Sequence, residues 1–191
     1  MTTTQDNPTA RTALHGQPVL NGAISVRELA LSGKISVRGD VAQAQFAQAL
    51  VPQDAKVPTS VGDRIEHDGV RVLCVGPDEW LLHLALDKVA AEIDRLQHAL
   101  TGQHAAVVDV SDYYTVLELS GVHTRDVLAK LTPLDVTAEA MPTGANQQTR
   151  MAKCSVLLMM QSDHCARLQV RWSHAEYLRD YLEEAAREYN A

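Results

Sequence analysis

Short runs of alternating apolar and polar residues are separated along the chain by longer segments in which apolar residues recur every three or four positions. The first pattern is typical of half-buried strands and the second of amphipathic helices. Residues 24–39 alternate on both sides of a turn at Ser32-Gly33 and therefore predict a hairpin. Asp40 precedes an apolar stripe over residues 41–51, where it is placed to cap a helix.

The rest of the first half predicts a second hairpin and a second helix. Two apolar runs, residues 69–75 and 79–85, are joined by a Gly-Pro-Asp segment whose residue types favour a turn. Residues 86–100 then repeat apolar side chains at helical spacing, and Gly102 ends the predicted helix. The first half thus runs strand, strand, helix, hairpin, helix.

The second half repeats this order of elements. Residues 105–110 and 113–119 predict two strands around a turn at Ser111-Asp112, and Gly121 then indicates a sharp turn or a close backbone approach before a helix. The remaining predicted elements are strands near 149–160 and 165–171 and a helix with Ser173 and Glu176 as a capping box and Glu183 and Arg187 as an ion pair.

The repeated order predicts an α+β fold whose two halves, residues 23–102 and 103–191, are related by pseudo-twofold symmetry and share a core. Residues 1–22 are polar, contain two prolines and show no periodicity. They therefore predict a flexible N-terminal tail that precedes a single domain over residues 23–191.

Composition narrows the classes of function. The 191 residues are 46% apolar, enough for a proper core, and the formal charge of -7 argues against nucleic-acid binding, which needs clustered Lys and Arg. No apolar run reaches the length that crosses a bilayer and no secretory signal is visible, so we expect a cytoplasmic protein that does not enter a membrane. Three cysteines, Cys74, Cys154 and Cys165, favour buried reduced thiols over a disulfide or a redox role.

The sequence contains no motif for a familiar catalytic or cofactor site. A Gly-x-Gly-x-x-Gly turn, a Walker loop and a Gly-x-Ser-x-Gly elbow are all missing, and the histidines do not fall at metal-ligand spacing. Asp109 and Asp112 are the most interesting carboxylates, as an acid/base pair or as ligands of a polar group. The alternative, which we favour, is a turn in which side-chain oxygens accept backbone N–H bonds. His123 and Thr124 similarly favour a helix entry over a catalytic pair.

Two tryptophans are candidates for contacts with other molecules. Trp80 is interpreted either as a stacking platform for a pterin or flavin or, more simply, as core or interface packing. Trp172 follows Arg171, and these residue types concentrate binding energy at protein interfaces. We therefore predict Trp80, Arg171 and Trp172 as partner-interface residues. Core packing is the simpler interpretation for the apolar methionines, which are Met141, Met151, Met159 and Met160.

Several segments resemble one known family. The run VDVSDYYTVLELSG, followed by TRDVLAKLTPLDV, is similar to the gamma subunit of heterotetrameric sarcosine oxidase, a relative of the folate domain of the glycine-cleavage T-protein. Further matching segments appear in the order expected for the family, from about residue 24 onward. They are ISVRELALSGKISVRGD, VGPDEWLL, AKCSVLLMM and VRWSHAEYLRDYLEEAA.

The resemblance implies a T-protein-like fold and a non-catalytic accessory role beside alpha, beta and delta subunits. Those partners are expected to hold FAD, FMN, NAD and tetrahydrofolate, while this chain has no catalytic, cofactor or metal site of its own. The complex would oxidatively demethylate sarcosine to glycine, transfer the one-carbon unit to tetrahydrofolate and release hydrogen peroxide. An isolated chain is expected to self-associate through exposed apolar surface. The alternatives are a subunit of a related N-methylglutamate dehydrogenase and a stand-alone folate-binding protein.

Overall fold

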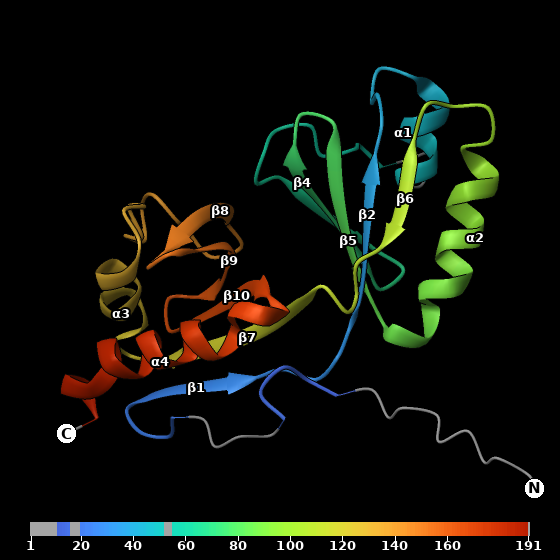
Figure 1. The fold of residues 1–191 in the computed structure, drawn as a ribbon. Coiled ribbons are helices and arrows are strands. Elements are labelled where there is room, and N and C mark those ends of the chain that lie inside the picture. Colours follow the sequence, from blue (N-terminus) through green and yellow to red (C-terminus); the bar gives the residue numbers. More distant parts are fainter. Residues whose placement is uncertain (1–10, 16–19, 52–54, 191) are drawn as a thin grey trace, which may run out of the picture.

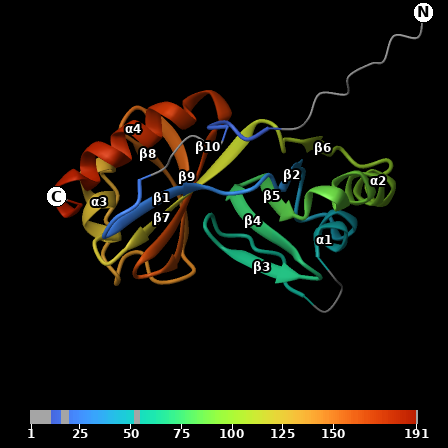
Figure 2. The same ribbon diagram turned by 90° about the horizontal axis from the view of Figure 1, so that it is seen from below.

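The computed structural model describes residues 11–15, 20–51 and 55–190, which form two five-stranded antiparallel sheets flanked by helices (Figure 1). Sheet A has the strand order β1-β7-β10-β9-β8, and sheet B has the order β3-β4-β5-β2-β6. Helices α3 and α4 lie on the outer side of sheet A, and helices α1 and α2 lie on the outer side of sheet B (Figure 2). The prediction of a fold that mixes helices with antiparallel strands is confirmed.

The elements follow one another in the same order in both halves. The first half contains β1 (Ile24–Glu28), β2 (Gly33–Arg38), α1 (Ala44–Leu50), β3 (Arg64–His67), β4 (Val70–Gly76), β5 (Glu79–Leu84), the 3-10 helix η1 (Leu86–Lys88) and α2 (Val89–Ala99). The second contains β6 (Ala106–Asp109), β7 (Tyr114–Gly121), α3 (Thr124–Leu131), β8 (Asn146–Met151), β9 (Cys154–Ser162), β10 (Cys165–Arg171), η2 (Trp172–His174), α4 (Ala175–Ala186) and η3 (Arg187–Tyr189).

The first predicted hairpin is wrong, because β1 and β2 belong to different sheets. β1 pairs with β7, with Ile24 opposite Gly121, whereas β2 pairs with β5 and β6. The strands before and after the turn at Ser111-Asp112 are likewise separated, since β6 lies in sheet B and β7 in sheet A. Alternation shows which residues form a strand but carries no information about which strand is its neighbour.

Gly121 sits where two strands approach closely, as predicted. Its φ of +141° is one that L side chains rarely adopt, and a Cβ added there would lie 2.1 Å from the carbonyl oxygen of Ala23. The close approach is possible only without a side chain. This position fixes the end of β7 against the start of β1.

The other hairpins are partly as predicted. β4 and β5 form the expected pair, but the single strand expected near 149–160 is divided between β8 and β9, which turn at Ala152 with a φ of +49°. Strand β3 was not predicted at all. The signal was present, because Asp68 and Gly69, with φ of +49° and +77°, are the residue types that a two-residue hairpin turn requires.

Helix starts differ from the predictions by a few residues. α1 begins at Ala44 rather than at position 41, and Asp40 instead accepts the amide of Ala42 at 2.9 Å in the preceding turn. The predicted capping box of the last helix is wrong, since η2 intervenes and the N-cap, His174, makes no side-chain capping bond.

The predicted ion pair between Glu183 and Arg187 is also absent from the described contacts of these residues. Arg187 instead contacts Glu184 at 2.5 Å, and Glu183 lies 3.8 Å from Arg179. Both observed pairs are spaced three or four positions apart, so they support the same helix with different partners.

Each sheet packs its helices over a separate apolar cluster, and a smaller cluster joins the inner faces. Between the sheets, Leu73 and Leu81 of sheet B pack with Leu157 and Met159 of sheet A. The predicted sharing of a core is therefore limited to this inner layer. The four methionines named above are buried, which confirms their assignment to the core. Among the described residues, no helix combines the length and hydropathy needed to cross a membrane.

Candidate partner interface

Trp80 lies in the core of the sheet B half, so its prediction as an interface residue is wrong for this structure. Its side chain is 0% exposed, its ring centroid is 5.3 Å from that of Phe46, and its Nε1 donates a 2.8 Å hydrogen bond to the carbonyl oxygen of Pro58. A buried indole needs this partner for its N–H. The side chain is consequently inaccessible to a second protein or to a stacking cofactor.

Arg171 and Trp172 occupy the opposite kind of environment, at the end of β10 and the start of η2. Both residues are exposed, and the Trp172 side chain is 42% accessible. The backbone N–H of Trp172 donates to the carbonyl oxygen of Tyr113 at 3.0 Å, and the guanidinium of Arg171 lies 5.3 Å from the centroid of the Tyr113 ring. These contacts hold an aromatic ring and a cation side by side on the surface.

Tyr113 extends this surface onto the crossover that leads from sheet B to sheet A. It is 45% exposed, and its ring meets that of Tyr114 edge-on with centroids 4.7 Å apart. Tyr114 is partly buried, and burial raises the pKa of its hydroxyl. Tyr113 therefore rests on a buried neighbour and keeps its free face toward solvent.

A short N-terminal segment completes the surface. Residues 11–15 belong to the predicted tail, yet Leu14 is only 1% exposed, and the amides of Ala13 and Leu14 donate to the Glu28 carboxylate at 2.9 and 3.0 Å. The same carboxylate accepts a 2.6 Å bond from the hydroxyl of Thr115. Residues 1–10 and 16–19 of the predicted tail lie outside the described residues. Residues 11–15 are held against sheet A by hydrogen bonds from backbone amides to the Glu28 carboxylate, and composition does not reveal such bonds.

The anchored segment brings His15 beside Trp172, with ring centroids 6.4 Å apart in an edge-on arrangement. Arg11, Thr12 and His15 line a shallow hollow of about 500 Å³ next to this contact. We call the exposed surface formed by His15, Tyr113, Arg171 and Trp172 the aromatic platform. Neither Arg11 nor Arg171 forms an ion pair with any described residue. The platform and the adjoining Arg11 thus combine exposed aromatic rings with two arginines, Arg11 and Arg171, whose charges are not paired with a carboxylate of the described residues.

Of the two carboxylates proposed as an acid/base pair or as ligands, Asp109 instead stabilises the crossover, and Asp112 is exposed beside it. The Asp109 carboxylate accepts the Ser111 amide at 2.9 Å, and the Ser111 hydroxyl accepts the Lys34 amide at 3.0 Å. This agrees with the interpretation as a turn, although the turn begins at Asp109 and joins two sheets. Burial lowers the pKa of Lys34 to about 8, against the opposing charges of Asp109 and Asp112.

A second polar group lies between the inner faces of the sheets. His83 of β5 and Gln169 of β10 each have a buried side-chain atom, Nε2 and Oε1, without a hydrogen-bond partner among the described residues. Burial, followed by the charges of Lys34 and Arg71, lowers the pKa of His83 to about 3, while Gln169 acts in the opposite direction. The imidazole is therefore neutral at physiological pH. These two side chains therefore affect how the sheets pack, and their buried atoms do not form an exposed reaction site.

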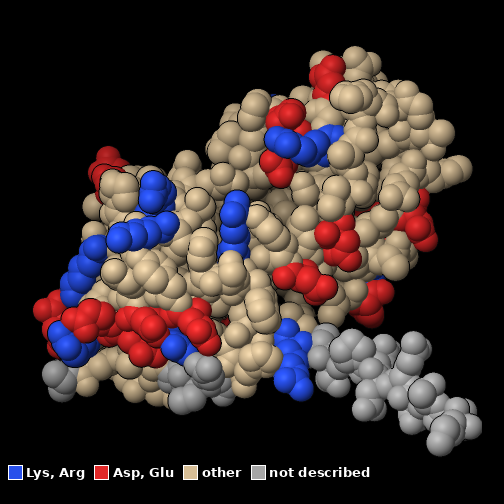
Figure 3. All heavy atoms as spheres, viewed as in Figure 1, with Lys and Arg blue, Asp and Glu red and all other residues tan. Residues whose placement is uncertain are grey.

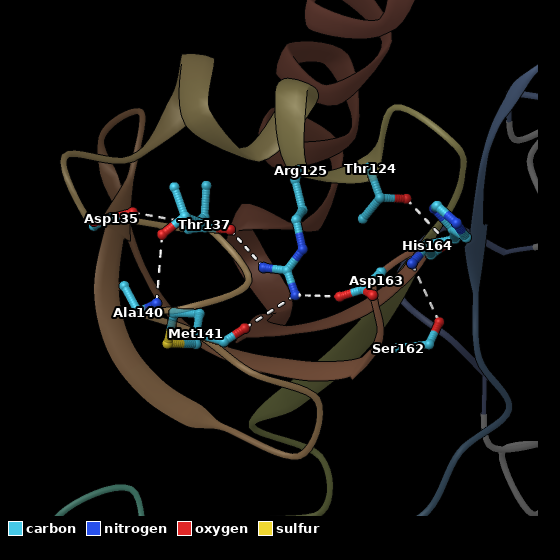
Figure 4. A network of polar contacts seen from close by, with 10 residues as sticks. Thr124, Arg125, Asp135, Thr137, Ala140, Met141, Ser162, Asp163 and His164 are labelled. Atoms are coloured by element: carbon cyan, nitrogen blue, oxygen red, sulfur yellow. Dashed lines mark hydrogen bonds and ion pairs between the residues drawn. The ribbon is translucent and has the colours of Figure 1, made fainter.

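Arg125 on α3 forms a polar network that also has a structural role (Figure 4). Its guanidinium donates to the carbonyl oxygens of Val136 and Met141 at 2.5 and 3.0 Å and to the Asp163 carboxylate at 2.8 Å. It therefore ties the loop after α3 to the β9–β10 turn. The terminal nitrogens of the guanidinium thus bind groups of the protein itself, while its buried Nε has no hydrogen-bond partner among the described residues.

The start of α3 is built by the neighbouring residues. The Thr124 hydroxyl lies within hydrogen-bond distance of the carbonyl oxygens of Gly121 and His164, at 2.8 and 3.1 Å, and His123 Nδ1 lies 2.8 Å from the Asp126 carboxylate. His123 and Thr124 lie at the start of α3, so their predicted place at the helix entry is confirmed. His123 is the N-cap residue but makes no side-chain capping bond.

A hollow of about 760 Å³ opens beside the β4–β5 turn and the start of α1, with Phe46 and His104 in its lining. Its arginine, Arg38, lies 3.5 Å from Asp78 and 3.4 Å from Glu79, so its charge is balanced. None of the buried, unpartnered side-chain atoms of the described residues belongs to this lining. The hollow therefore gives no indication of a specific ligand.

The three cysteines are free thiols, with Cys74 and Cys154 buried and Cys165 partly buried. Burial raises the pKa of each thiol, which disfavours the reactive thiolate. Among the described residues, no group of three or more His, Cys, Asp or Glu side chains is arranged to hold a metal ion.

Comparison with known proteins identifies the family. The model of the sarcosine oxidase gamma subunit family matches residues 38–188. The gamma subunit from Corynebacterium sp. (strain U-96) is 29% identical over 170 residues, which cover 88% of this chain and 82% of that protein. The gamma subunit from an Arthrobacter species is 32% identical over 138 residues, which cover 72% of this chain and 67% of that protein.

Solved structures give the same result. A chain of heterotetrameric sarcosine oxidase from Corynebacterium sp. U-96, in complex with pyrrole 2-carboxylate, matches with a TM-score of 0.85 and 26% identity over 95% of this chain and 97% of that chain. The glycine cleavage aminomethyltransferase T from Bartonella henselae matches with a TM-score of 0.62 and 14% identity over 87% of this chain and 47% of that chain, which shows a shared fold alone. This chain therefore belongs to the sarcosine oxidase gamma subunit family.

Proposed function

We propose that this chain is the accessory gamma subunit of a heterotetrameric sarcosine oxidase and has no active site of its own. The observation that carries the proposal is the match over nearly the full length of a chain within such an oxidase. Of the side chains that sequence analysis put forward for catalysis, Asp109 is engaged in a turn, and His123 and Thr124 are engaged in a helix start. Asp112 is exposed in the same turn region. That arrangement supports a role in assembly.

In this proposal the alpha, beta and delta subunits hold FAD, FMN, NAD and tetrahydrofolate and act in the cytoplasm. The complex oxidises the N-methyl group of sarcosine, releases glycine and hydrogen peroxide, and passes the one-carbon unit to tetrahydrofolate. The relatives bear the name sarcosine oxidase, which supports this substrate over N-methylglutamate. The fold shared with the T-protein does not by itself favour folate binding, because fold and function are separable.

We further propose that the two halves are related by pseudo-twofold symmetry. Sheet A uses one strand of the first half, β1, and four of the second, while sheet B uses one strand of the second half, β6, and four of the first. Reading sheet B from β6 gives the order β6-β2-β5-β4-β3, which matches β1-β7-β10-β9-β8 element by element. The exchange of first strands would tie both halves into one unit.

Co-purification tests the accessory role. The tagged chain, isolated from its own cells, is expected to retain partner subunits that give the eluate visible flavin absorption and sarcosine-dependent peroxide production. Partner identity is checked by mass spectrometry. A colourless single chain that gains thermal stability on addition of tetrahydrofolate would contradict the proposal and favour a folate-binding protein.

A further inference from the structure

We propose that the aromatic platform, together with Arg11, binds an acidic segment of the larger partner subunits and seats an apolar side chain of that segment against Trp172. This inference rests on the proposed accessory function and names the surface and the chemistry of the contact. The occupant is a protein segment that carries carboxylates beside at least one aliphatic or aromatic residue.

The apolar part of the platform is suited to a protein contact. Tyr113 and Trp172 are 45% and 42% exposed and lie next to each other because the Trp172 amide bonds to the Tyr113 carbonyl group. Large aromatic side chains that remain exposed in the isolated chain gain most when a partner excludes water from them. An apolar side chain of the partner that packs on this exposed aromatic surface would exclude water from it.

The charged part of the platform specifies an acidic partner. Most arginines of the described chain are in ion pairs, as in the Arg27–Glu118, Arg95–Glu92 and Arg125–Asp163 contacts. Arg11 and Arg171, like Arg64 and Arg150 elsewhere, have no such pair among the described residues, but only Arg11 and Arg171 of these four flank the exposed aromatic rings of the platform. Guanidinium groups bind carboxylates through paired hydrogen bonds, so carboxylates are the complementary groups.

The platform is organised before a partner arrives. The Glu28 carboxylate fixes residues 11–15 through the amides of Ala13 and Leu14, and it is itself oriented by Thr115. This places His15 against Trp172 and Arg11 at the rim of the hollow. Because the backbone of these residues is already held, association has less conformational entropy to remove, which is the general benefit of preorganisation.

The neighbouring charge argues for a short acidic segment over an extended polyanion. Figure 3 shows Asp and Glu side chains gathered in a band along α4, the helix that begins next to the platform. A nucleic acid laid across the platform would extend over this band and be repelled, whereas a short segment does not need to extend over α4. The hollow at Arg11 is lined by Arg11, Thr12 and His15 and so lacks the mostly apolar lining that is typical of small-molecule sites.

The test measures binding of the full-length chain to the purified complex of the remaining alpha, beta and delta subunits. Two platform variants are compared with wild type, namely Trp172→Ala and the double charge reversal Arg11→Glu with Arg171→Glu. Two matched controls lie on α4 or at its end. Tyr181→Ala removes an aromatic ring that is 41% exposed, and Arg187→Glu reverses an arginine whose side chain is 76% exposed.

Each platform variant is expected to weaken binding at least about 30-fold, as is typical of central interface residues, while the controls change it less than about threefold. The affinity of wild type should fall as salt rises, and this dependence should be smaller in the double reversal. Thermal unfolding of every variant is recorded beside the binding data, so that loss of folding is not read as loss of contact.

The outcomes separate the two proposals. Wild-type chain that binds no flavin-bearing subunit overturns the proposed function and this inference together. Wild-type binding that survives both platform variants, or that only the α4 controls abolish, keeps the function and overturns the platform. Loss with Trp172→Ala but not with the double reversal overturns the acidic character of the occupant.

Discussion

The stretches β5–η1–α2 and β10–η2–α4 have the same order of elements, and each contains one of the two tryptophans of the chain. Trp80 is the second residue of β5 and is fully buried, whereas Trp172 is the first residue of η2 and is 42% exposed. The residue type is the same and the environments are opposite. The difference shows that position relative to the sheet face decides whether a tryptophan is buried in the core or remains at the surface.

Strand register explains the burial of the first tryptophan. Trp80 lies opposite Val37 on β2 and Cys74 on β4, and it shares an apolar cluster with Phe46 of α1. Trp172 comes after the last residue of β10, Arg171, beyond the paired part of the sheet. Its side chain is 42% exposed, and its described ring contact is with His15.

The two strands also differ in what they place between the sheets. β5 contributes His83, which lies opposite Lys34 and Arg71, while β10 contributes the uncharged Gln169 among apolar neighbours. Arg167 lies two residues before Gln169 on the same face of β10 and contacts Glu118 at 3.0 Å, so both sides carry charged groups, but the imidazole with the lowered pKa comes from β5. Substitutions in the two stretches should accordingly separate folding from association.

The largest effect is expected from Trp80→Ala. Removal of this ring leaves a cavity beside Phe46 and an unpaired carbonyl group at Pro58, so the free energy of unfolding should fall by about 3–5 kcal/mol. Urea denaturation followed by circular dichroism measures the loss. Trp80→Phe, which keeps most of the volume, should lose less. A Trp80→Ala protein as stable as wild type would contradict the core assignment.

A smaller effect is expected from acid, through His83. Its pKa is about 3 in the folded protein and near 6.5 in the unfolded chain, so the unfolded state binds the proton first as the pH falls. This contribution to stability is intact above about pH 6.5 and declines toward pH 3, with a loss of about 2 kcal/mol by pH 5.

Urea midpoints at pH 7.5 and pH 5 measure this loss in wild type and in His83→Gln, which cannot take up the proton. The variant should show a smaller decrease between the two pH values. The matched control is His98→Gln, at an exposed position on α2, and it should behave as wild type does. An equal decrease in all three proteins would contradict a buried neutral imidazole.

Trp172→Ala should change the free energy of unfolding by no more than about 0.5–1 kcal/mol, because little contact is lost with the rest of the chain. The same variant is expected to weaken partner binding strongly. Stability and affinity are measured in parallel. Trp172→Ala should lose affinity and keep stability, whereas Trp80→Ala should lose stability. A stability loss for Trp172→Ala as large as that of Trp80→Ala would remove the contrast between the two stretches.

The smallest perturbation uses the two tryptophans as probes without removing an aromatic ring. Because the chain has only these two, Trp172→Phe reports Trp80 alone and Trp80→Phe reports Trp172 alone. Acrylamide should quench the emission of Trp172 readily and that of Trp80 weakly. Addition of the partner subunits should protect Trp172 and leave Trp80 unchanged. Protection of neither would contradict the platform as the contact surface.

Local chemistry allowed parts of this structure to be predicted from sequence. Period-two and period-3.6 patterns placed most strands and helices, and Gly121 was identified as a close approach because glycine is needed there. The turn role of Ser111 and the core role of the methionines also followed from residue type. The strand β3 was missed although the Asp68-Gly69 turn marked it.

Long-range contacts account for what the sequence did not reveal. The anchoring of residues 11–15 depends on the carboxylate of Glu28, and the platform depends on β7, β10 and this segment meeting in space. Such contacts leave no periodic signal. These contacts are seen only in the three-dimensional structure, where the strands lie side by side.

The sequence by itself determined the kinds of elements and the mixture of helix with antiparallel strand, because these follow from residue types and their local spacing, and it indicated the family through its resemblance to known gamma subunits. Only the tertiary structure decided that β1 and β6 each join the sheet of the other half, that Trp80 is buried and that Trp172 stands exposed beside Arg171. Strand pairing and burial are set by the free energy of the whole packed chain, to which every distant segment contributes.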